Sequence, residues 1–598
     1  MISKMELNLK LLGLTLAIST VATAIDQAPF HDAARPNIIV ILTDDQDLHM
    51  QSVEYMPLLK KHIIDHGTYY KKHFCTTAIC CPSRVSLWTG RNAHNTNVTD
   101  VNPPYGGYPK FIAQGFNQNY LPVWLQEAGY NTFYTGKLFN AHTVANWNSP
   151  HPAGWTSSDF LLDPFTYEYL NATFQKDNQP PRSYEGQYST DVLAEKGFEL
   201  LDQAVAEEKP FFLTLAPIGP HSNVAANIFA GRTGPFTDEE IRKVHMTAPI
   251  PAERHKHLFP DVKVPRTANF NPDKPSGASW IKHLNQLNDE VIQYNDDFYR
   301  ARLQALQAVD ELIEGLFNRL ENFDILDNTY VIYTSDNGFH ISQHRLPPGK
   351  ECAFEEDINV PLIIRGPGIS SGKETSVVTA HTDIVPTIFE LAGIKLRDDF
   401  DGSSIPLTKE QLEHAKTERQ EHVNVEYWGR SLSEGEHEFS LDDGKFVTFG
   451  SNNTYKALRV IGENYNLFYS VWCTNEHELY DLTTDPYQIN NLYVTTKSLP
   501  EPSIMGIPLS KVLPRLDALL MVTKSCKGAT CVKPWRVLHP QGDVETLGDA
   551  LRGEFDTFYE QELQQKVSFD KCELGYIVQS EGPQAHQLAF GESLKYEL

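Results

Sequence analysis

The chain has 598 residues, of which 41% are hydrophobic and 21% are charged, and its formal net charge is −26 at pH 7. This length exceeds what a single core supports, so we expect two domains, and the composition excludes a disordered or fibrous protein. The negative charge argues against nucleic acid and anionic membranes as partners, so an anionic substrate would need a local group of cations.

The first residues have the pattern of a secretory signal peptide. Lys4 and Lys10 precede an apolar run that ends in the small-x-small sequence "ATA" before residue 25. We therefore predict a signal peptide over residues 1–24. An uncleaved anchor is the alternative, but the run is shorter than a membrane-spanning helix. No long apolar run follows, so we expect no stable membrane association.

Other short motifs fit the secretory pathway. The sequons at Asn97, Asn171 and Asn452 predict N-glycosylation. We expect an extracellular or a lysosome- or vacuole-like location. The last four residues, "KYEL", resemble an endoplasmic-reticulum retrieval signal with Tyr596 in place of the usual acidic residue, so retrieval is the alternative.

An oxidising compartment favours disulfides among the eight cysteines. These are Cys75, Cys80, Cys81, Cys352, Cys473, Cys526, Cys531 and Cys572. Cys526 and Cys531 could close a small loop. If Cys80 serves another purpose, seven remain, and an odd number leaves at least one thiol unpaired.

Three uninterrupted apolar runs predict central strands of a sheet that is covered on both faces. They are Ile38–Leu42, Phe211–Ala216 and Tyr330–Tyr333, and each is followed by polar residues. Leucines at helical spacing between residues 303 and 320 predict a helix on this sheet, as does the segment 381–394. The predicted fold class is α/β, with a large mixed, mostly parallel sheet sandwiched by helices.

A polar, charged stretch over residues 396–420 suggests the domain boundary. We predict a catalytic domain over 25–410 and a smaller α+β domain over 411–598. Short alternating segments in the second domain, such as "YKALRVIG" and "YNLFYSVW", predict an antiparallel sheet. The Pro- and Asn-rich insertion 222–300 is expected to form loops over the site and no domain of its own.

The residues that follow the first and third apolar runs indicate a metal. Asp44, Asp45, Asp336 and Asn337 offer only hard oxygen ligands, which suit Ca²⁺ or Mg²⁺ and bind Zn²⁺ poorly. Each pair alone is an ordinary turn sequence. Both pairs end buried strands, however, and the carboxyl ends of parallel strands meet at one edge of a sheet.

The stretch "AICCPSRVSLWTGR" carries the nucleophile candidate. Pro82 tolerates the first turn of a helix, so Cys80 should lie at a helix N-terminus, where free N–H groups favour an anion. Arg84, one turn on, could add a guanidinium. From the dipeptide alone, a disulfide partner or a small buried hydrophobe is the more ordinary interpretation of two cysteines.

The same stretch resembles the signature of the type I sulfatases, C-x-P-S-R followed by Thr-Gly, in the alkaline phosphatase superfamily. In that family a formylglycine-generating enzyme oxidises the first cysteine to formylglycine (3-oxoalanine), so the resemblance implies that Cys80 and not Cys81 is modified. "GYNTFYTGKLFN" resembles the second signature, with Lys137 as its lysine. The similarity continues from "TDDQD" to "ELYDLTTDPYQINNL", and the nearest branch resembles the fungal arylsulfatases and N-acetylglucosamine-6-sulfatase.

The resemblance implies a role for each site residue. Formylglycine at position 80, in its hydrated form, would attack the sulfur of a sulfate monoester, with Ca²⁺ held by this residue and by the Asp44, Asp45, Asp336 and Asn337 set. Arg84, Lys137 and Lys350 would stabilise the developing charge. His221 and Lys350 would donate a proton to the leaving group; a core histidine and a surface lysine are the alternatives.

One position departs from the family pattern. Asn140 stands near the place where many sulfatases have a histidine that acts as a base, and an amide cannot act as one. Either His142 or another group takes that role, or Asn140 positions a hydroxyl. His340 and His344 are further candidates for contact with the substrate, with surface histidines as the alternative.

The resemblance implies a sulfuric ester hydrolase. We expect an arylsulfatase with a small aryl sulfate as substrate, and a 6-O-sulfated glucosamine as the alternative. A phosphomonoester or phosphonate hydrolase and an unconverted, inactive binding protein are further alternatives. The loops 97–120, 142–185 and 222–290 are expected to select the substrate, and their composition leaves both sulfates open.

Overall fold

A ten-stranded mixed sheet forms the centre of this computed structural model. The structure describes residues 35–225, 245–418, 420–495, 500–584 and 588–591. The predicted signal peptide and the C-terminal "KYEL" lie outside these ranges. The strand order in the sheet is β13-β2-β12-β11-β1-β8-β4-β5-β6-β7.

The five central strands run parallel to one another. They are β11 (Thr329–Ser335), β1 (Asn37–Thr43), β8 (Phe211–Ala216), β4 (Asn131–Lys137) and β5 (Ser157–Leu161). Antiparallel pairs occur only toward the edges of the sheet. The outer strands are β13 (Lys373–Thr375), β2 (Thr68–Tyr70), β12 (Leu362–Arg365), β6 (Thr173–Lys176) and β7 (Arg182–Ser183). The three predicted strands are therefore confirmed, and all three are central.

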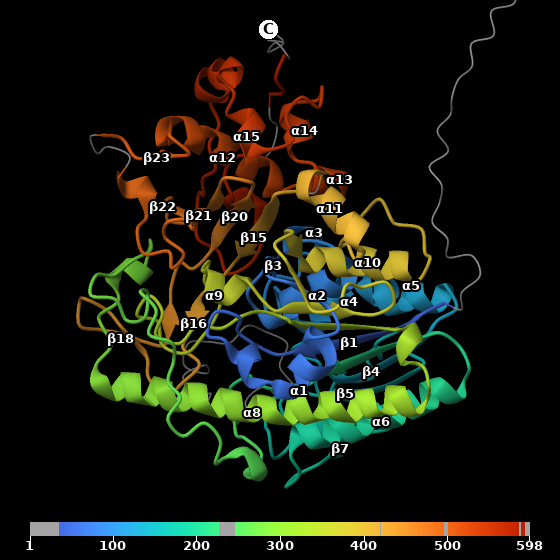
Figure 1. Ribbon diagram of the computed structural model, residues 1–598. Coiled ribbons are helices and arrows are strands. Elements are labelled where there is room, and N and C mark those ends of the chain that lie inside the picture. The colour runs from blue at the N-terminus through green and yellow to red at the C-terminus, as the bar shows by residue number, and fades with distance from the viewer. Residues whose placement is uncertain (1–34, 226–244, 419, 496–499, 585–587, 592–598) are drawn as a thin grey trace, which may run out of the picture. The chain divides into compact units, whose positions relative to one another are not determined.

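Helices cover both faces of the sheet (Figure 1). Alternate residues of β1 point to opposite faces, so Ile38, Val40 and Leu42 pack in one core and Ile39 and Ile41 in the other. The first core includes α2 (Cys80–Thr89), α5 (Leu121–Glu127) and α10 (Ile384–Leu391). The second includes α6 (Ser189–Ala206) and α8 (Asp289–Asn322). The predicted α/β class with helices on both faces is confirmed.

Helix α8 begins earlier than the sequence suggests. It starts at Asp289, inside the predicted insertion 222–300, and Asn288 caps it by accepting a hydrogen bond from Val291 N at 2.9 Å. The first turns are rich in Asp, Asn and Gln, so they lack the apolar spacing by which a helix is predicted. In the described part of the insertion before α8, β9 (Asn223–Ala225) pairs with β10 (His245–Thr247), and irregular loops and short turns follow.

The C-terminal part contains the predicted antiparallel sheet, of order β15-β20-β21-β22. Its strands are β15 (His422–Tyr427), β20 (Tyr455–Ile461), β21 (Asn466–Trp472) and β22 (His477–Asp481). Helix α12 (Leu509–Thr523) packs on one face of this sheet. The chain from Arg35 onward clusters as one compact unit, so the boundary between 25–410 and 411–598 stays a prediction.

Two disulfides lie within the C-terminal part. Cys526 pairs with Cys531, as the sequence suggests, and Cys473 pairs with Cys572. Cys75, Cys80, Cys81 and Cys352 are free and buried. Over the described ranges, we find no helix with the length and apolar character that crossing a membrane requires.

Candidate active site

The register of the central strands brings the predicted metal ligands together. Thr43 of β1 pairs with Ser335 of β11, so the residues that follow each strand lie side by side. Asp45 N donates to Asp336 Oδ1 at 3.0 Å, and Asn337 Nδ2 donates to Asp45 Oδ1 at 2.7 Å. The four predicted ligands, including Asp44, are fully buried.

Three cations approach these carboxylates from other elements. Lys137, the last residue of β4, places Nζ 2.6 Å from Asp44 Oδ2. Arg84 of α2 donates from Nε to Asp336 Oδ2 at 2.8 Å. Lys350 Nζ lies 2.6 Å from Asp45 Oδ2. Each of the three buried carboxylates thus has a buried cation as partner, because an unpaired charge that is removed from water is strongly destabilising.

The carboxylates differ in how well they are compensated. Burial and the neighbouring Asp336 raise the pKa of Asp44 to about 7, against the effect of Lys137. Burial also disfavours the charge of Asp45, but Lys350 overcomes it and holds the pKa of Asp45 below its ordinary value. Without a further positive charge, Asp44 is therefore the least satisfied carboxylate of the group.

Cys80 faces this group from the start of α2. Its Sγ lies 3.6 Å from Asp44 Oδ1 and 4.0 Å from Asp45 Oδ1. Burial raises the pKa of the Cys80 thiol well above its ordinary value, although Lys137 and Lys350 act in the opposite direction. Cys81 instead packs in the core between α2 and the sheet. The predicted preference for Cys80 over Cys81 has this geometric basis.

His221 and Lys350 lie together at one side of Cys80. His221 Nδ1 is 2.8 Å from the carbonyl oxygen of Ser222, which can only accept, so Nδ1 carries the proton. The other nitrogen, Nε2, lies 3.4 Å from Lys350 Nζ. Burial lowers the pKa of His221 to about 4, against the attraction of Asp45, so the imidazole is neutral at neutral pH.

Tyr167 was missed at the sequence level and touches three of the predicted residues. Its ring stacks on His221 with centroids 4.1 Å apart, and Lys137 Nζ lies 4.7 Å from the centre of the same ring. Asn140 Nδ2 donates to the Tyr167 hydroxyl at 2.6 Å. No local pattern in the sequence around Tyr167 distinguishes it from other loop tyrosines.

The other predicted histidines lie elsewhere. His142 is buried among aromatic rings, and both of its ring nitrogens lack hydrogen-bond partners within the described ranges. His340 Nδ1 bonds to Asp357 at 2.7 Å, and His344 stacks on Phe354. None of the three histidines lines the cavity described next, so their contact with a substrate stays a prediction without geometric support.

A cavity of about 220 Å³ opens beside Cys80. The predicted loops contribute Asp100–Asn102, Asp163, Tyr167, Val224 and Met246 to its lining. The C-terminal part also contributes, which the sequence did not indicate, with Tyr427, Arg430, Leu432, Glu434, Phe449 and Leu574. The cavity wall is therefore built from both predicted domains.

Comparison with known proteins identifies the family. The family model "Sulfatase" matches residues 36–394, and the model "N-sulphoglucosamine sulphohydrolase, C-terminal" matches residues 348–501. The chain belongs to the sulfatase family. This sulfatase is 38% identical to an arylsulfatase of Volvox carteri, over 88% of this chain and 80% of that protein. It is 32% identical to an N-acetylglucosamine-6-sulfatase of Capra hircus, over 85% of this chain and 86% of that protein.

A solved structure has the same fold. It is a complex with that protein's substrate, D-glucosamine-2-N,6-O-disulfate, and it superimposes on this sulfatase with a TM-score of 0.58. The superposition covers 78% of this chain and 95% of that chain at 22% sequence identity. At this identity the likeness bears on the fold, and it supports the alkaline phosphatase-like arrangement expected from the signatures.

The donor set of this sulfatase fits a hard divalent cation. Asp44 and Asp45 have carboxylate oxygens close to Cys80 Sγ and to a nitrogen of His221. Asn337 Oδ1 is buried and, within the described ranges, has no hydrogen-bond partner. An amide oxygen without a partner beside buried carboxylates is what a Ca²⁺ or Mg²⁺ ligand set provides, and the His221 imidazole and the Cys80 sulfur are the softer donors of the group.

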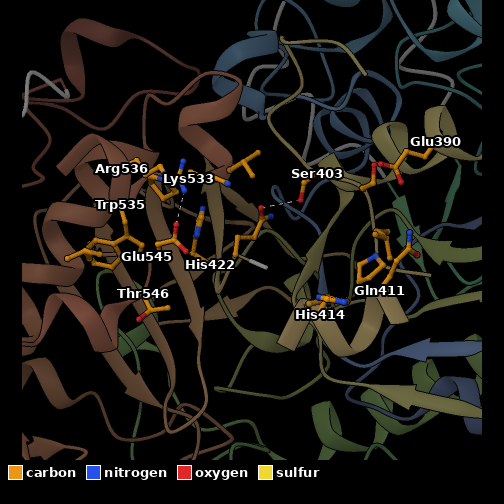
Figure 2. A pocket seen from close by; sticks show the side chains of 18 residues that line it. Glu390, Ser403, Gln411, His414, His422, Lys533, Trp535, Arg536, Glu545 and Thr546 are labelled. Carbon is orange, nitrogen blue, oxygen red and sulfur yellow. Dashed lines mark hydrogen bonds and ion pairs between the residues drawn. The ribbon is translucent and has the colours of Figure 1, made fainter. Parts of the chain in front are cut away.

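A second cavity of about 380 Å³ lies apart from these residues, between α11 (Lys409–Glu418) and α14 (Trp535–Leu538) (Figure 2). Figure 2 shows Trp535 and the Arg536–Glu545 ion pair on one side and Gln411 on the other. None of the predicted site residues lines it. The larger cavity of this sulfatase is therefore not the one that holds the candidate nucleophile.

Proposed function

We propose that this protein is an arylsulfatase that hydrolyses sulfate monoesters to a phenol or alcohol and sulfate. One observation carries the proposal: Cys80 Sγ lies within 4.0 Å of Asp44 and Asp45, while Lys137 and Lys350 bind the same two carboxylates. A nucleophile, a cation site and two fixed ammonium groups thus converge on one point. The similarity to arylsulfatases over most of the chain supports this function.

The nucleophile is proposed to be formylglycine made from Cys80. As a thiol, Cys80 would be a weak nucleophile, because burial raises its pKa so far that the thiolate is scarce at neutral pH. A formylglycine-generating enzyme would act on the chain during maturation. When present, the hydrated aldehyde supplies a hydroxyl to attack sulfur and a second hydroxyl through which sulfate is released, which a serine could not do.

The cofactor is proposed to be Ca²⁺, held by Asp44, Asp45, Asp336, Asn337 and residue 80. When bound, the ion polarises the sulfate oxygens as a Lewis acid. It would also compensate Asp44, whose pKa is raised to about 7 by burial and by Asp336 in the ion's absence.

Lys137, Arg84 and Lys350 would hold the charge of the sulfate group. Lys137 stays protonated because Asp44 overcomes the effect of burial and raises the pKa of Lys137. Arg84 is fixed by Asp336 and by the carbonyl oxygen of Lys137, so its position does not depend on the substrate. Donors that are held in place before the reaction lower the barrier without reorganisation.

The His221–Lys350 pair would serve the leaving oxygen. Burial disfavours the ammonium of Lys350, but Asp45 raises the pKa of Lys350 well above its ordinary value, so the group is protonated. His221 is neutral, with Nε2 toward Lys350. The pair therefore presents an ammonium proton next to an imidazole nitrogen, and we assign to it the protonation of the leaving oxygen.

The substrate is proposed to be an aryl sulfate, with N-acetylglucosamine 6-sulfate as the second candidate. Each of the two relatives named above supports one of these candidates. The cavity of about 220 Å³ has room for one ring, and Tyr167, Tyr427 and Phe449 offer aromatic surfaces for either ring. The three histidines His142, His340 and His344 are not needed in this assignment.

Export is proposed from the sequence. A signal peptide over 1–24 would precede the catalytic domain 25–410 and the C-terminal domain 411–598. The mature protein would be extracellular or reside in a lysosome- or vacuole-like compartment, unless "KYEL" acts in retrieval. Of the predicted glycosylation sites, Asn452 is exposed, and Asn97 and Asn171 are partly exposed.

The test is sulfate release by the purified secreted protein from 4-nitrophenyl sulfate and N-acetylglucosamine 6-sulfate, with 4-nitrophenyl phosphate as the control. We expect sulfate release and a preference for either sulfate over the phosphate. Mass spectrometry of the peptide with residue 80 reports conversion to formylglycine. A converted protein that releases phosphate faster than sulfate, or releases neither, contradicts the proposed function.

A further inference from the structure

The wall of the catalytic cavity beyond Cys80 is acidic. Its acidic and basic residues are Asp100, Asp163, Glu351 and Glu434 against Lys350 and Arg430. This is unexpected for an enzyme whose substrate is an anion, since the cations that receive sulfate, Lys137 and Arg84, do not line this wall. In the lining of the cavity the acids therefore outnumber the cations, four to two.

One of the acids, Glu434, is already compensated by a cation, and Asp163 has a structural contact. Glu434 Oε1 forms an ion pair with Lys350 Nζ at 2.8 Å, and Glu434 Oε2 accepts a hydrogen bond from the Ser222 hydroxyl at 2.8 Å. Asp163 Oδ2 accepts from Ala141 N at 2.7 Å, which fixes the loop after β4. The ion pair accounts for Glu434 without a ligand, and the backbone contact gives Asp163 a structural role.

Asp100 and Glu351 are not compensated in this way. Asp100 Oδ1 accepts only from the backbone, from Val101 N at 2.6 Å, and Glu351 Oε2 accepts from Leu432 N at 2.6 Å. Within the described ranges neither carboxyl group has an ion-pair partner, although Glu351 is only 5% exposed. Burial raises the pKa of Asp100 to about 6 and, together with Glu434, raises the pKa of Glu351 well above its ordinary value.

The backbone holds Glu351 in place. Glu351 has a φ of +79°, a left-handed conformation that side chains other than glycine rarely adopt. Its carbonyl oxygen accepts from Asn453 Nδ2 at 2.8 Å. Lys350 and Glu351 are consecutive residues, and both line the cavity. Lys350 binds Asp45 beside Cys80, whereas Glu351 belongs to the acidic wall.

A polar atom without a partner lies in the same cavity wall. Asn140 is only 9% exposed, and its Oδ1 has no hydrogen-bond partner in the part of the chain that the structure describes. Like an ionised carboxylate, this amide oxygen can only accept. An acceptor-rich wall is satisfied by a ligand that brings N–H or O–H donors and is poorly matched to a second anionic group.

We propose that Asp100 and Glu351 select substrates by the charge of the leaving group: they favour one that carries hydroxyl or ammonium donors and reject one with a second anionic group. This specificity rests on the proposed sulfatase function of the same cavity. A second anion is repelled by the ionised Asp100 and disfavours ionisation of Glu351, whereas an ammonium or hydroxyl donor favours the ionised, accepting form of both groups.

The test uses aryl sulfates that differ in the para substituent, which carries a positive, no or a negative charge: 4-(aminomethyl)phenyl, 4-(hydroxymethyl)phenyl and 4-(carboxymethyl)phenyl sulfate. We expect kcat/KM of the wild-type protein to fall in this order near neutral pH, with the carboxylate at least about tenfold below the alcohol. Glucosamine 6-sulfate and its N-sulfated form make the matching pair of sugars.

Variants separate specificity from the intrinsic reactivity of each ester. Glu351→Gln and Asp100→Asn remove an ionisable carboxyl group while keeping nearly the same shape, and each is expected to narrow the alcohol-to-carboxylate ratio about threefold or more. Glu127→Gln, at an exposed position outside the cavity, is the matched control and should leave the ratio unchanged. A merely structural role of Glu351 would lower kcat/KM for all esters equally.

The outcomes are distinct. Equal kcat/KM for the three aryl sulfates, or ratios that stay unchanged in both Glu351→Gln and Asp100→Asn, overturn the proposed selection and leave the sulfatase function intact. If the protein carries formylglycine and cleaves none of the sulfates, the proposed function itself fails, and the selection fails with it.

Discussion

Two buried networks of charges in this molecule look alike and differ in one respect. In the active-site network, Asp44, Asp45 and Asp336 pair with Lys137, Lys350 and Arg84. In the second network, beside the C-terminal sheet, Glu426 accepts from His94 Nδ1 at 2.9 Å and from Lys456 Nζ at 2.8 Å.

In the second network Glu426, His94 and Lys456 all have hydrogen-bond partners, and Lys456 also forms an ion pair with Glu581 at 3.5 Å. His94 Nε2 bonds to the carbonyl oxygen of Cys526 at 2.8 Å, and Lys456 also lies 4.2 Å from the centre of the Trp428 ring. The active-site network instead keeps Asn337 Oδ1 without a partner among the described residues and has Cys80 on a cavity wall. Buried ion pairs alone thus do not mark an active site; an incomplete set of partners next to a cavity does.

The sharpest way to separate the two networks is to remove the nucleophile. Cys80→Ala is expected to lower turnover of 4-nitrophenyl sulfate by more than about 1000-fold, because no other group supplies the attacking oxygen. The melting temperature should stay close to that of the wild type. Cys81→Ala is the control: it leaves a small cavity in the core and should keep turnover. Equal turnover in Cys80→Ala and wild type would disprove the assignment.

The opposite result is expected for the second network. Glu426→Gln leaves His94 buried beside a neutral partner and leaves Lys456 with only its longer ion pair to Glu581, at 3.5 Å. Breaking a buried ion pair costs about 3 kcal/mol or more of stability. Denaturant unfolding should show this loss, while kcat/KM per folded molecule stays near that of the wild type. A large loss of kcat/KM in a folded Glu426→Gln protein would mean that this network also serves the reaction.

The proposed calcium site can be tested apart from turnover. Asp336→Asn removes the charge that holds Arg84 and accepts from Asp45 N, and we expect calcium affinity to fall about 10- to 100-fold. Elemental analysis and calorimetric titration measure this directly. Asp159→Asn, a buried aspartate paired with Lys196 outside the site, is the matched control. Unchanged calcium content in Asp336→Asn would remove Asp336 from the ligand set.

A smaller effect on stability is expected when the pH changes the protonation of His94. Burial alone would lower the pKa of His94, but the carboxylate of Glu426 overcomes it, and the pKa of His94 is raised above its ordinary value. A raised pKa means that protonated His94 stabilises the fold fully below about pH 6.5, and that this contribution is lost as pH rises through the folded-state pKa.

The measurement is the melting temperature across this range. We expect the wild type to lose melting temperature between about pH 6.5 and alkaline pH, and His94→Gln to lose less over the same interval. Since the comparison is a difference between two proteins, the other titrating groups cancel. Parallel curves for the two proteins would mean that His94 does not titrate with folding.

The sequence predicted the elements that carry an uninterrupted local pattern. Strands β1, β8 and β11 are continuous apolar runs, and their ends indicated Asp44, Asp45, Asp336 and Asn337 at one edge. Strand β4 was not predicted, because "NTFYTGK" mixes polar, aromatic and glycine residues, and it was its likeness to a family signature that pointed to Lys137.

The acidic wall could not be predicted from the sequence. Its residues come together because the segment around Leu432 and Glu434 packs against Lys350 and Glu351, which lie far earlier in the chain. Such a contact depends on how the C-terminal sheet meets the catalytic sheet, and no local spacing records it. Tyr167 was missed because its contacts with Lys137, Asn140 and His221 likewise join separate segments of the chain.

Substitution of Tyr167 tests the active-site network with the smallest expected effect. Tyr167→Phe keeps the ring that stacks on His221 and removes only the hydroxyl that accepts from Asn140 Nδ2. Losing one buried hydrogen bond costs about 1 kcal/mol, so we expect kcat to fall about fivefold with little change in melting temperature. Tyr167→Leu also removes the stacked ring, and it should lower kcat further because His221 is then free to turn. If Tyr167→Phe lowers kcat as much as Tyr167→Leu, the hydroxyl has a direct role in the reaction, and Asn140 together with Tyr167 takes the place of the histidine that the family pattern leads one to expect.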